Sequence, residues 1–173
     1  MTVTVWGAPE GWDAVLLARR GGEHAGPLVH VARDDSRMAH IAEALAFFAP
    51  DIEVLRFPAW DCLPYDRVGP NPELVSERIA TLARLLEPPP EGRRRILLTT
   101  VNALVQRVPP RHVFHGSSRV LAVGGTVEPE DLARFLEANG YGRSGTVMEP
   151  GEYATRGGII DLFPAGEPEP VRL

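Results

Sequence analysis

An arginine near the end of the chain could bind a charged partner. Arg156 precedes Gly157-Gly158, and Asp161 lies in the β-branched and aromatic run 159–163 that follows. Glycine reaches positive φ at no steric cost, so the two glycines predict a turn between two strands, 153–156 and 159–163. We call this turn the glycine corner. An arginine at such a corner can form bidentate, charge-assisted bonds to a carboxylate. The alternative is a solvated turn arginine beside a surface carboxylate.

Two further pairs of polar residues have spacings that occur in metal or catalytic sites. His112 and His115 lie three residues apart, but a metal site needs three or four ligands, and no cysteine or acidic cluster is near in the sequence. We therefore expect surface or satisfied histidines and no metal site. Asp61 and Asp66 lie in a proline-rich loop and could form paired carboxylates. We favour the alternative that they accept hydrogen bonds from loop amides.

A glycine near the N-terminus stands where a nucleotide-binding α/β protein carries its phosphate loop. That loop reads G-x-x-x-x-G-K-[ST], with a lysine for the phosphates and a hydroxyl for Mg²⁺. Aligned from Gly7, the second glycine, the lysine and the hydroxyl are replaced by Trp12, Asp13 and Ala14. A bulky ring would block the phosphates and a carboxylate would repel them. We expect no ATP binding here, no cofactor in this chain and no catalytic residue.

Composition disfavours several classes of function. The formal net charge is −5, whereas a domain that holds DNA by its phosphates usually has an excess of basic residues. The sequence contains no lysine, which excludes a Schiff-base or P-loop lysine. Cys62 is the only cysteine, so no intrachain disulfide can form. Without a signal peptide or a long apolar run, we expect a cytoplasmic protein with no membrane contact.

The elements that would position these residues begin as alternating strands and helices. Apolar runs predict strands at 2–6, 28–32, 52–57 and 96–100, and helical spacing predicts the helices between them, at 12–20, from about 35 to 49 and at 73–86, with a short helix at 102–108. Continuous apolar strands in this alternation predict an α/β fold, a parallel sheet flanked by helices on both faces. The arginine triplet 93–95 predicts a solvated start of the last of these strands.

Two irregular stretches interrupt this pattern. Prolines rule out a regular element at 58–72, and Trp60, Leu63 and Tyr65 predict a packed loop there. The alternation of strands and long helices ends near residues 117–119. After it we expect a strand at 120–123, a helix from about 129 to 138 with a C-cap at Asn139-Gly140, and then the glycine corner. These elements predict a small α+β domain, so we place domains at 1–118 and 119–173.

Several long motifs resemble one family. The stretches are 57–66, FPAWDCLPYD; 76–82, SERIATL; 102–109, NALVQRVP; and 148–164, MEPGEYATRGGIIDLFP. Together, and in this order, they are similar to the transcription-repair coupling factors (Mfd). The excision-repair protein UvrB shares the implied architecture but has an intact phosphate loop and a tyrosine-rich, DNA-clamping hairpin in this region. Neither appears in this sequence, and both departures match the coupling factors.

This resemblance implies a fold and a role. The fold would be a degenerate P-loop, RecA-like domain similar to UvrB domain 1a, followed by a small domain similar to UvrB domain 2. The full coupling factor is a cytoplasmic, ATP-dependent DNA translocase, a helicase-like hydrolase that displaces RNA polymerase stalled at a lesion. It recruits UvrA for nucleotide excision repair. This chain would be its N-terminal piece, and ATP, Mg²⁺, DNA and RNA polymerase would be bound by domains that it lacks.

The resemblance also implies a partner-binding site. Two arginines that contact UvrA in the family fall on Arg156 and on Arg172, in a strand expected beyond Pro170. A third family contact, an aromatic residue, would lie past Leu173, so we expect the second domain to be truncated. Two alternatives stay open: a UvrB-type ATPase or DNA-damage-binding domain, which needs a phosphate loop, and a general DNA-binding module, which the charge disfavours.

Overall fold

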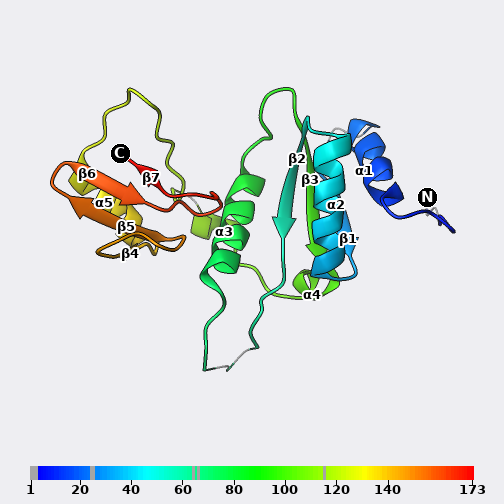
Figure 1. Cartoon of the computed structure of the whole chain (residues 1–173), viewed down its shortest axis with the longest axis horizontal. Helices are drawn as coiled ribbons and strands as arrows, with labels where there is room; N and C mark the ends of the chain where they lie inside the picture. Colours follow the sequence, from blue (N-terminus) through cyan, green and yellow to red (C-terminus); the bar gives the residue numbers. More distant parts are fainter. Residues whose placement is uncertain (1–3, 24–25, 64, 66, 115) are drawn as a thin grey trace. The chain divides into compact units, whose positions relative to one another are not determined.

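The computed structural model describes residues 4–23, 26–63, 65, 67–114 and 116–173 of the chain (Figure 1). They form two compact units, one from Met1–Ala59 with Glu87–Arg107 and the other from Trp60–Leu86 with Val108–Leu173. This grouping by packing does not test the boundary expected between residues 118 and 119, which stays a prediction. No helix in the described ranges has the length and apolar character needed to cross a membrane.

The first unit contains the parallel sheet expected from the sequence. Its strands, in the spatial order β1-β3-β2, are β1 (Leu28–Ala32), β2 (Ile52–Phe57) and β3 (Arg94–Thr100). Both neighbouring pairs are parallel. The helices of this unit are α1 (Trp12–Glu23), α2 (Asp35–Phe48) and the short α4 (Val101–Leu104). The prediction of a parallel sheet flanked by helices is confirmed.

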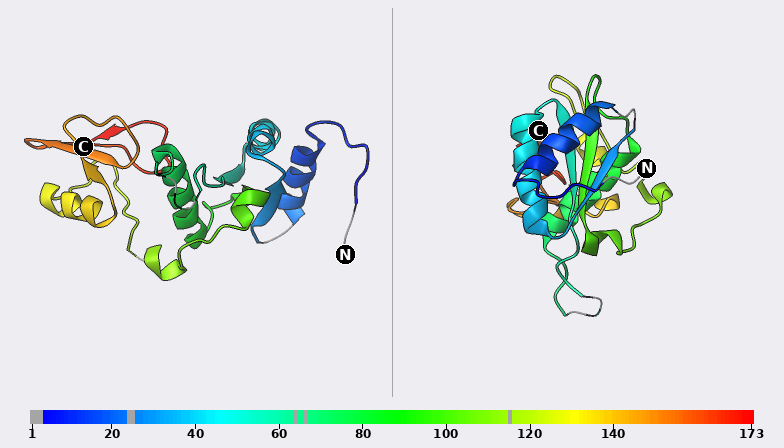
Figure 2. Two further views of the ribbon diagram at one scale, coloured as in Figure 1. Left: turned by 90° about the horizontal axis from the view of Figure 1, so that it is seen from below. Right: turned by 90° about the vertical axis from the view of Figure 1, so that its right-hand side faces the viewer.

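The core of this unit lies between the sheet and its two long helices (Figure 2). Ile96 and Leu98 of β3 pack in one buried cluster with Leu17 of α1 and with Ile41 and Leu45 of α2. Because alternate residues of a strand face opposite sides, α1 and α2 cover the same face of β3. Helix α2 begins after Asp34, whose side chain accepts a hydrogen bond from the Arg37 backbone N–H.

A buried ion pair corrects one sequence-based prediction. The register of β2 and β3 sets Glu53 opposite Arg95, and Arg95 Nε lies 2.6 Å from Glu53 Oε2. Both side chains are only 6% exposed, so the prediction of a solvated arginine triplet is wrong for Arg95. Arg95 also donates to the Glu87 carbonyl at 2.7 Å, and Arg94 donates to the Gly21 carbonyl at 3.1 Å. These arginines therefore attach β3 to its surroundings.

Two expected strands do not form in the described residues. Residues 2 and 3 lie outside the described ranges, and residues 4–6 have no regular structure. Residues 120–123 also form no strand, and Val120 and Val123 are exposed. β-Branched residues favour strands only where a neighbouring backbone pairs with them. Here the stretch runs into a turn at Gly124, which has φ of +84°.

The second unit contains a small mixed sheet with one helix packed on it. The sheet order is β4 (Gly142–Arg143), β5 (Glu152–Arg156), β6 (Ile159–Leu162) and β7 (Val171–Arg172). Strands β4 and β5 are parallel, and the remaining neighbours are antiparallel. The unit also contains α3 (Pro72–Leu86), the 3₁₀ helix η1 (Arg111–Phe114) and α5 (Pro129–Ala138). The sequence therefore predicted the glycine corner and its two strands correctly.

Helix α5 covers one face of this small sheet. Leu132 and Leu136 of α5 pack in a buried cluster with Tyr153, Ile160 and Leu162 of β5 and β6. The helix ends as the sequence predicted: Gly140 has φ of +84°, and the Tyr141 backbone N–H donates to the Leu136 carbonyl. The opposite face of β5 and β6, which carries Asp161 and Arg156, is not covered by α5.

The hydroxyl of Tyr153 joins β5 to α5. It donates to Glu137 Oε1 at 2.5 Å, and this bond, more than burial, raises the pKa of Tyr153 above its ordinary value of 10.0. Tyr153→Phe removes the bond but keeps the ring, so we expect the second unit to lose about 1 kcal/mol of unfolding free energy. Urea unfolding of both variants at neutral pH measures this difference.

The same bond makes a pH prediction. A raised pKa means that the folded state favours the neutral hydroxyl, so the bond stabilises the fold fully below pH 10. Its contribution is lost as the pH rises through the higher pKa of the folded state. The difference between wild type and Tyr153→Phe should therefore shrink above pH 10, and a constant difference there would contradict this assignment.

The proline-rich loop is only partly packed. Trp60 lies beneath the Arg78 guanidinium, 4.1 Å from its ring centroid, which fits the predicted packing role. Leu63 and Tyr65 are exposed, so the packed-loop prediction is wrong for these two residues. Tyr65 has φ of +79°, which directs the backbone into a turn that only a few non-glycine residues adopt.

Helix α3 holds the connection between β6 and β7. Ser76 Oγ accepts a hydrogen bond from the Gly166 backbone N–H at 2.9 Å. Gly166 has φ of +81°, and a Cβ added there would lie 2.5 Å from the Ala80 Cβ. Only glycine fits this close approach, because any other residue would be strained and would clash. The Ala165 backbone N–H, beside it, donates to the Tyr141 hydroxyl at 3.0 Å.

Candidate partner-binding face

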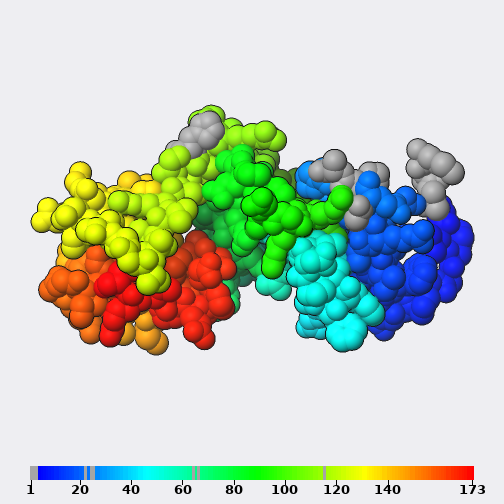
Figure 3. Space-filling model, turned by 90° about the horizontal axis from the view of Figure 1, so that it is seen from above, coloured from blue at the N-terminus to red at the C-terminus, as the bar shows by residue number. Residues whose placement is uncertain are grey.

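The open face of the small sheet gathers the charged residues that the sequence singled out. Tyr153 of β5 and its partner Leu162 of β6 belong to the core beneath α5. Because neighbouring residues of a strand face opposite sides, the next pair, Ala154 and Asp161, points away from α5. Asp161 is paired with Arg172 of β7, and Arg156 ends β5 on the same side by strand alternation. We call Arg156, Asp161 and Arg172 the arginine face. In Figure 3 the red β7 lies against the orange strands of this unit.

A two-bonded ion pair joins two members of the arginine face. Arg172 Nε lies 2.6 Å from Asp161 Oδ1, and Arg172 Nη2 lies 2.9 Å from Asp161 Oδ2. This fork geometry is the one that guanidinium and carboxylate groups adopt in bidentate pairs. The Arg172 side chain remains 69% exposed, whereas that of Asp161 is 20% exposed. Asp161 therefore holds the arginine from within the sheet.

The charges of this pair perturb each other. The hydrogen bonds from Arg172 lower the pKa of Asp161, and the positive charge of Arg156 lowers it further. The same pairing raises the pKa of Arg172. A lowered aspartate pKa means that the pair stabilises the fold above the ordinary pKa of the carboxyl group. That contribution is lost as the pH falls through the lower pKa of the folded state.

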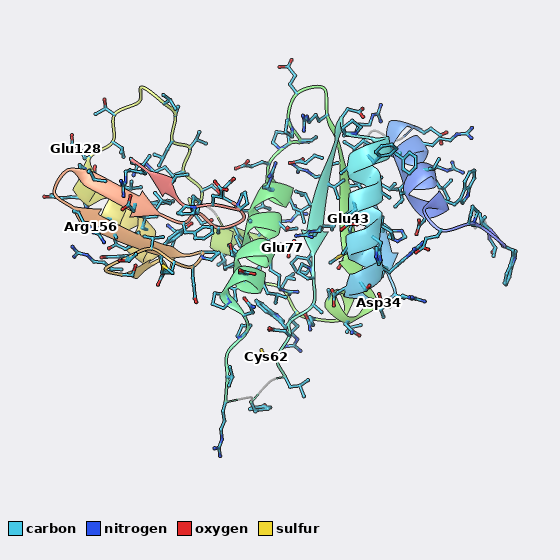
Figure 4. All side chains as sticks on the ribbon, in the orientation of Figure 1. Asp34, Glu43, Cys62, Glu77, Glu128 and Arg156 are labelled. Carbon is cyan, nitrogen blue, oxygen red and sulfur yellow. The ribbon has the colours of Figure 1, made fainter. Side chains whose placement is uncertain are left out.

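The guanidinium of Arg156 is positioned by a neighbouring loop. Its Nη2 donates to the Gly145 carbonyl and, at 3.3 Å, to Thr146 Oγ1. An arginine side chain has five N–H donors, so such anchoring leaves others to face a partner. Figure 4 labels Arg156, the last residue of β5. Arg156 is exposed, so the alternative of a solvated turn arginine beside a surface carboxylate stays open.

Arg156, Asp161 and Arg172 line one hollow of about 390 Å³, together with Thr146, Val147, Pro170 and Val171. The hollow therefore combines two cations, one carboxylate and apolar groups on a single sheet face. Such a combination can receive a protein segment that carries a carboxylate beside an apolar side chain. The one carboxylate that lines it, Asp161, is already bonded to Arg172.

The other polar pairs from the sequence do not form a site among the described residues. His112 lies exposed in η1, and His115 lies outside the described residues. Asp61 accepts from the Asn71 backbone N–H at 3.3 Å, as we favoured, whereas Asp66 lies outside the described residues. The part of the chain that the structure describes contains no cluster of histidine, cysteine or acidic residues suited to a metal ion.

The loop aligned with a phosphate loop carries an internal ion pair. Asp13, in the position of the P-loop lysine, has its Oδ2 2.7 Å from Arg37 Nη2. Arg37 also contacts Glu10 at 3.3 Å. His30 lies close enough to feel both Asp13 and Arg37, and burial lowers its pKa. The lysine position of a phosphate loop is thus occupied by the Asp13 carboxylate, which is paired with Arg37 of α2.

Sequence reasoning missed the groups that anchor Arg156. The Gly145 carbonyl and the Thr146 hydroxyl are ten or more residues away from Arg156, on the connection between β4 and β5. A two-residue strand such as β4 has no periodicity to detect. Asp161 is the one acidic residue inside a run that otherwise reads as a strand, but its pairing with Arg172 depends on the register of β6 and β7, which the sequence does not give.

Comparisons with known proteins agree with the expected resemblance. A family model described as the UvrB interaction domain matches residues 120–173. The chain is 38% identical to the transcription-repair-coupling factor of Escherichia coli K12 over 92% of the chain and 14% of that protein. The identities are 31% with the factor of Haemophilus influenzae, over 94% of the chain and 14% of that protein, and 36% with that of Myxococcus xanthus, over 91% and 13%. The chain thus spans about 14% of the length of the relatives it matches.

Proposed function

We propose that this chain is the N-terminal, UvrB-like part of a transcription-repair-coupling factor and that it docks UvrA through the arginine face. The likeness to coupling factors along more than nine-tenths of the chain supports the family. The match of residues 120–173 to the UvrB interaction domain supports a protein-binding role for the unit that carries Arg156 and Arg172. In the whole factor, this docking would bring excision repair to stalled RNA polymerase.

The observation that carries the proposal is the meeting of Arg156 and Arg172 at one hollow. The two residues lie in different strands, β5 and β7, and both side chains are exposed on the face that α5 leaves open. Arginines are enriched at the energetic centres of protein interfaces because their planar, multiply donating head groups pair with carboxylates. A pair of them around an apolar hollow fits a docking surface better than a catalytic one.

We propose that this part of the factor neither hydrolyses ATP nor holds a cofactor. The carboxylate of Asp13 and the ring of Trp12 stand where a phosphate loop needs a cation and a bare backbone. The contacts of Arg37 support this reading, since this one guanidinium is shared by the carboxylates of Asp13 and Glu10 and is not free for a phosphate. ATP, Mg²⁺, DNA and RNA polymerase would act in the rest of the coupling factor.

The experiment that tests the proposal is a binding titration of the fluorescently labelled 173-residue chain with purified UvrA. We expect saturable binding that weakens as the salt concentration rises, because charged groups meet at the surface. A parallel titration with ATP by calorimetry should give no heat of binding. Absence of UvrA binding by the folded chain would overturn the docking proposal, and clear binding of ATP would favour the UvrB-type ATPase.

A further inference from the structure

Asp161 is the acidic member of a face that is otherwise suited to an acidic partner. It lies in the middle of the small sheet, where β6 pairs with both β5 and β7. Its direct neighbours across the strands are Ala154 on one side and Arg172 on the other. A carboxylate at this position therefore competes with any partner carboxylate for the same guanidinium groups.

The two arginines of the face differ in the groups that they bind. Arg172 gives Nε and Nη2 to Asp161 in a two-bonded fork, so most of its charge is already neutralised. Arg156 lies diagonally across from Asp161, since its direct partner on β6 is Ile159. Its Nη2 goes to uncharged oxygen atoms of Gly145 and Thr146. Within the arginine face, Arg156 thus keeps a positive charge that no directly bonded carboxylate neutralises.

We propose that Asp161 sets the specificity of the arginine face by neutralising Arg172, so that the face accepts a UvrA segment with one carboxylate, placed on Arg156. This inference rests on the proposed docking of UvrA. Two arginines and one aspartate leave a net charge of about +1 on the face, which matches a single carboxylate better than a cluster of acidic residues or a phosphate group. Asp161 is a specificity-determining residue, and Arg172 is needed chiefly to keep the Asp161 carboxylate paired and away from Arg156.

This division makes an unusual prediction for Arg172. Removing Arg172 alone leaves the Asp161 carboxylate without its guanidinium, within diagonal reach of Arg156. The carboxylate would then pair with Arg156 and repel the partner. A second substitution that removes the charge of Asp161 should restore part of the lost affinity. A purely supporting role for Asp161 predicts the reverse, because losing it would add to the damage.

The test is a double-mutant cycle on UvrA binding with Arg172→Met, Asp161→Asn and the variant that carries both. Methionine keeps an apolar stem and asparagine keeps the shape of aspartate, so circular dichroism should find all three folded. We expect the double variant to bind UvrA about 3- to 30-fold more tightly than Arg172→Met alone. Asp161→Asn alone should bind at least as well as wild type at low salt and lose affinity more steeply as salt is added.

Each outcome decides something different. If the double variant binds no better than Arg172→Met, Asp161 does not set the charge of the face and this inference is overturned, while the docking proposal stands. If Asp161→Asn alone binds more weakly than wild type at low salt, Asp161 positions Arg172 and the inference is again wrong. If wild type does not bind UvrA, the proposed function fails, and this inference fails with it.

Discussion

Replacing Arg156 by alanine is expected to weaken binding of the chain to UvrA by about 30- to 1000-fold, the equivalent of about 2–4 kcal/mol. The substitution removes the charge of the arginine face that is not bonded to a carboxylate, together with the stem that borders the hollow. Arg156 is exposed, and within the described part of the chain it bonds to the loop at Gly145 and Thr146. The fold should therefore survive, and circular dichroism should match wild type.

A matched control separates this effect from a general loss of positive charge. Arg134 lies on α5 in the same unit, and its side chain is 76% exposed and paired with Asp131. It is on the helix that covers the opposite face of the sheet. Arg134→Ala changes the net charge by the same amount but should leave UvrA binding within about 2-fold of wild type. Equal loss in both variants would show that overall charge, and not the arginine face, governs the affinity.

Replacing Glu53 by alanine should destabilise the first unit by about 3–5 kcal/mol, which is a large share of the stability of a typical domain. The substitution leaves the Arg95 guanidinium buried beside the sheet without its carboxylate, 2.6 Å away in the wild type. The bond from Arg95 to the Glu87 carbonyl cannot neutralise that charge. Hydrogen exchange of the β2 and β3 amides, followed across a urea series, reports the loss within this unit.

Two other variants give this prediction its contrast. Glu43 lies exposed on α2 of the same unit, and it is labelled in Figure 4. Glu43→Ala should change stability by no more than about 0.5 kcal/mol. Replacing both members of the buried pair, Glu53→Leu with Arg95→Met, should recover most of the loss, because apolar residues of similar volume can substitute for a buried ion pair. If Glu53→Ala were as mild as Glu43→Ala, the pair would be far more solvated than the structure places it.

The regular elements of the fold could be predicted where two signals agreed. Helix α2 has both a capping aspartate and an apolar stripe, and strands β1 and β2 were placed at the residues where they occur. The strand expected at 120–123 had only composition in its favour, and no neighbouring backbone pairs with it. Arg95 was misjudged for a related reason. Its burial depends on Glu53 of another strand, and local sequence carries no register between strands.

The candidate site was predicted as a pair of residues and not as an arrangement. The glycine corner identified Arg156, and the family resemblance identified Arg172; that these arginines bind UvrA stays a prediction. Their meeting at one hollow depends on the pairing of β7 with β6, and a strand of two residues is too short to be predicted from the sequence. The bond between Asp161 and Arg172 follows from that pairing, because residues directly opposite in a sheet share a face.

The contact between Ser76 and Gly166 bears on how the docking surface could be moved into another protein. The connection that leads into β7, and so to Arg172, is held by a helix that precedes it by 90 residues in the chain. A graft of residues 119–173 would carry both arginines, the pairing of β6 with β7 and the bond from Ala165 to Tyr141, but it would lose the bond from Gly166 to Ser76. The connection would then be held at fewer points, and we expect the pairing of Arg172 with Asp161 to be less well fixed. A working transplant needs residues 60–86 as well, supplied as a second segment that can assemble with the first.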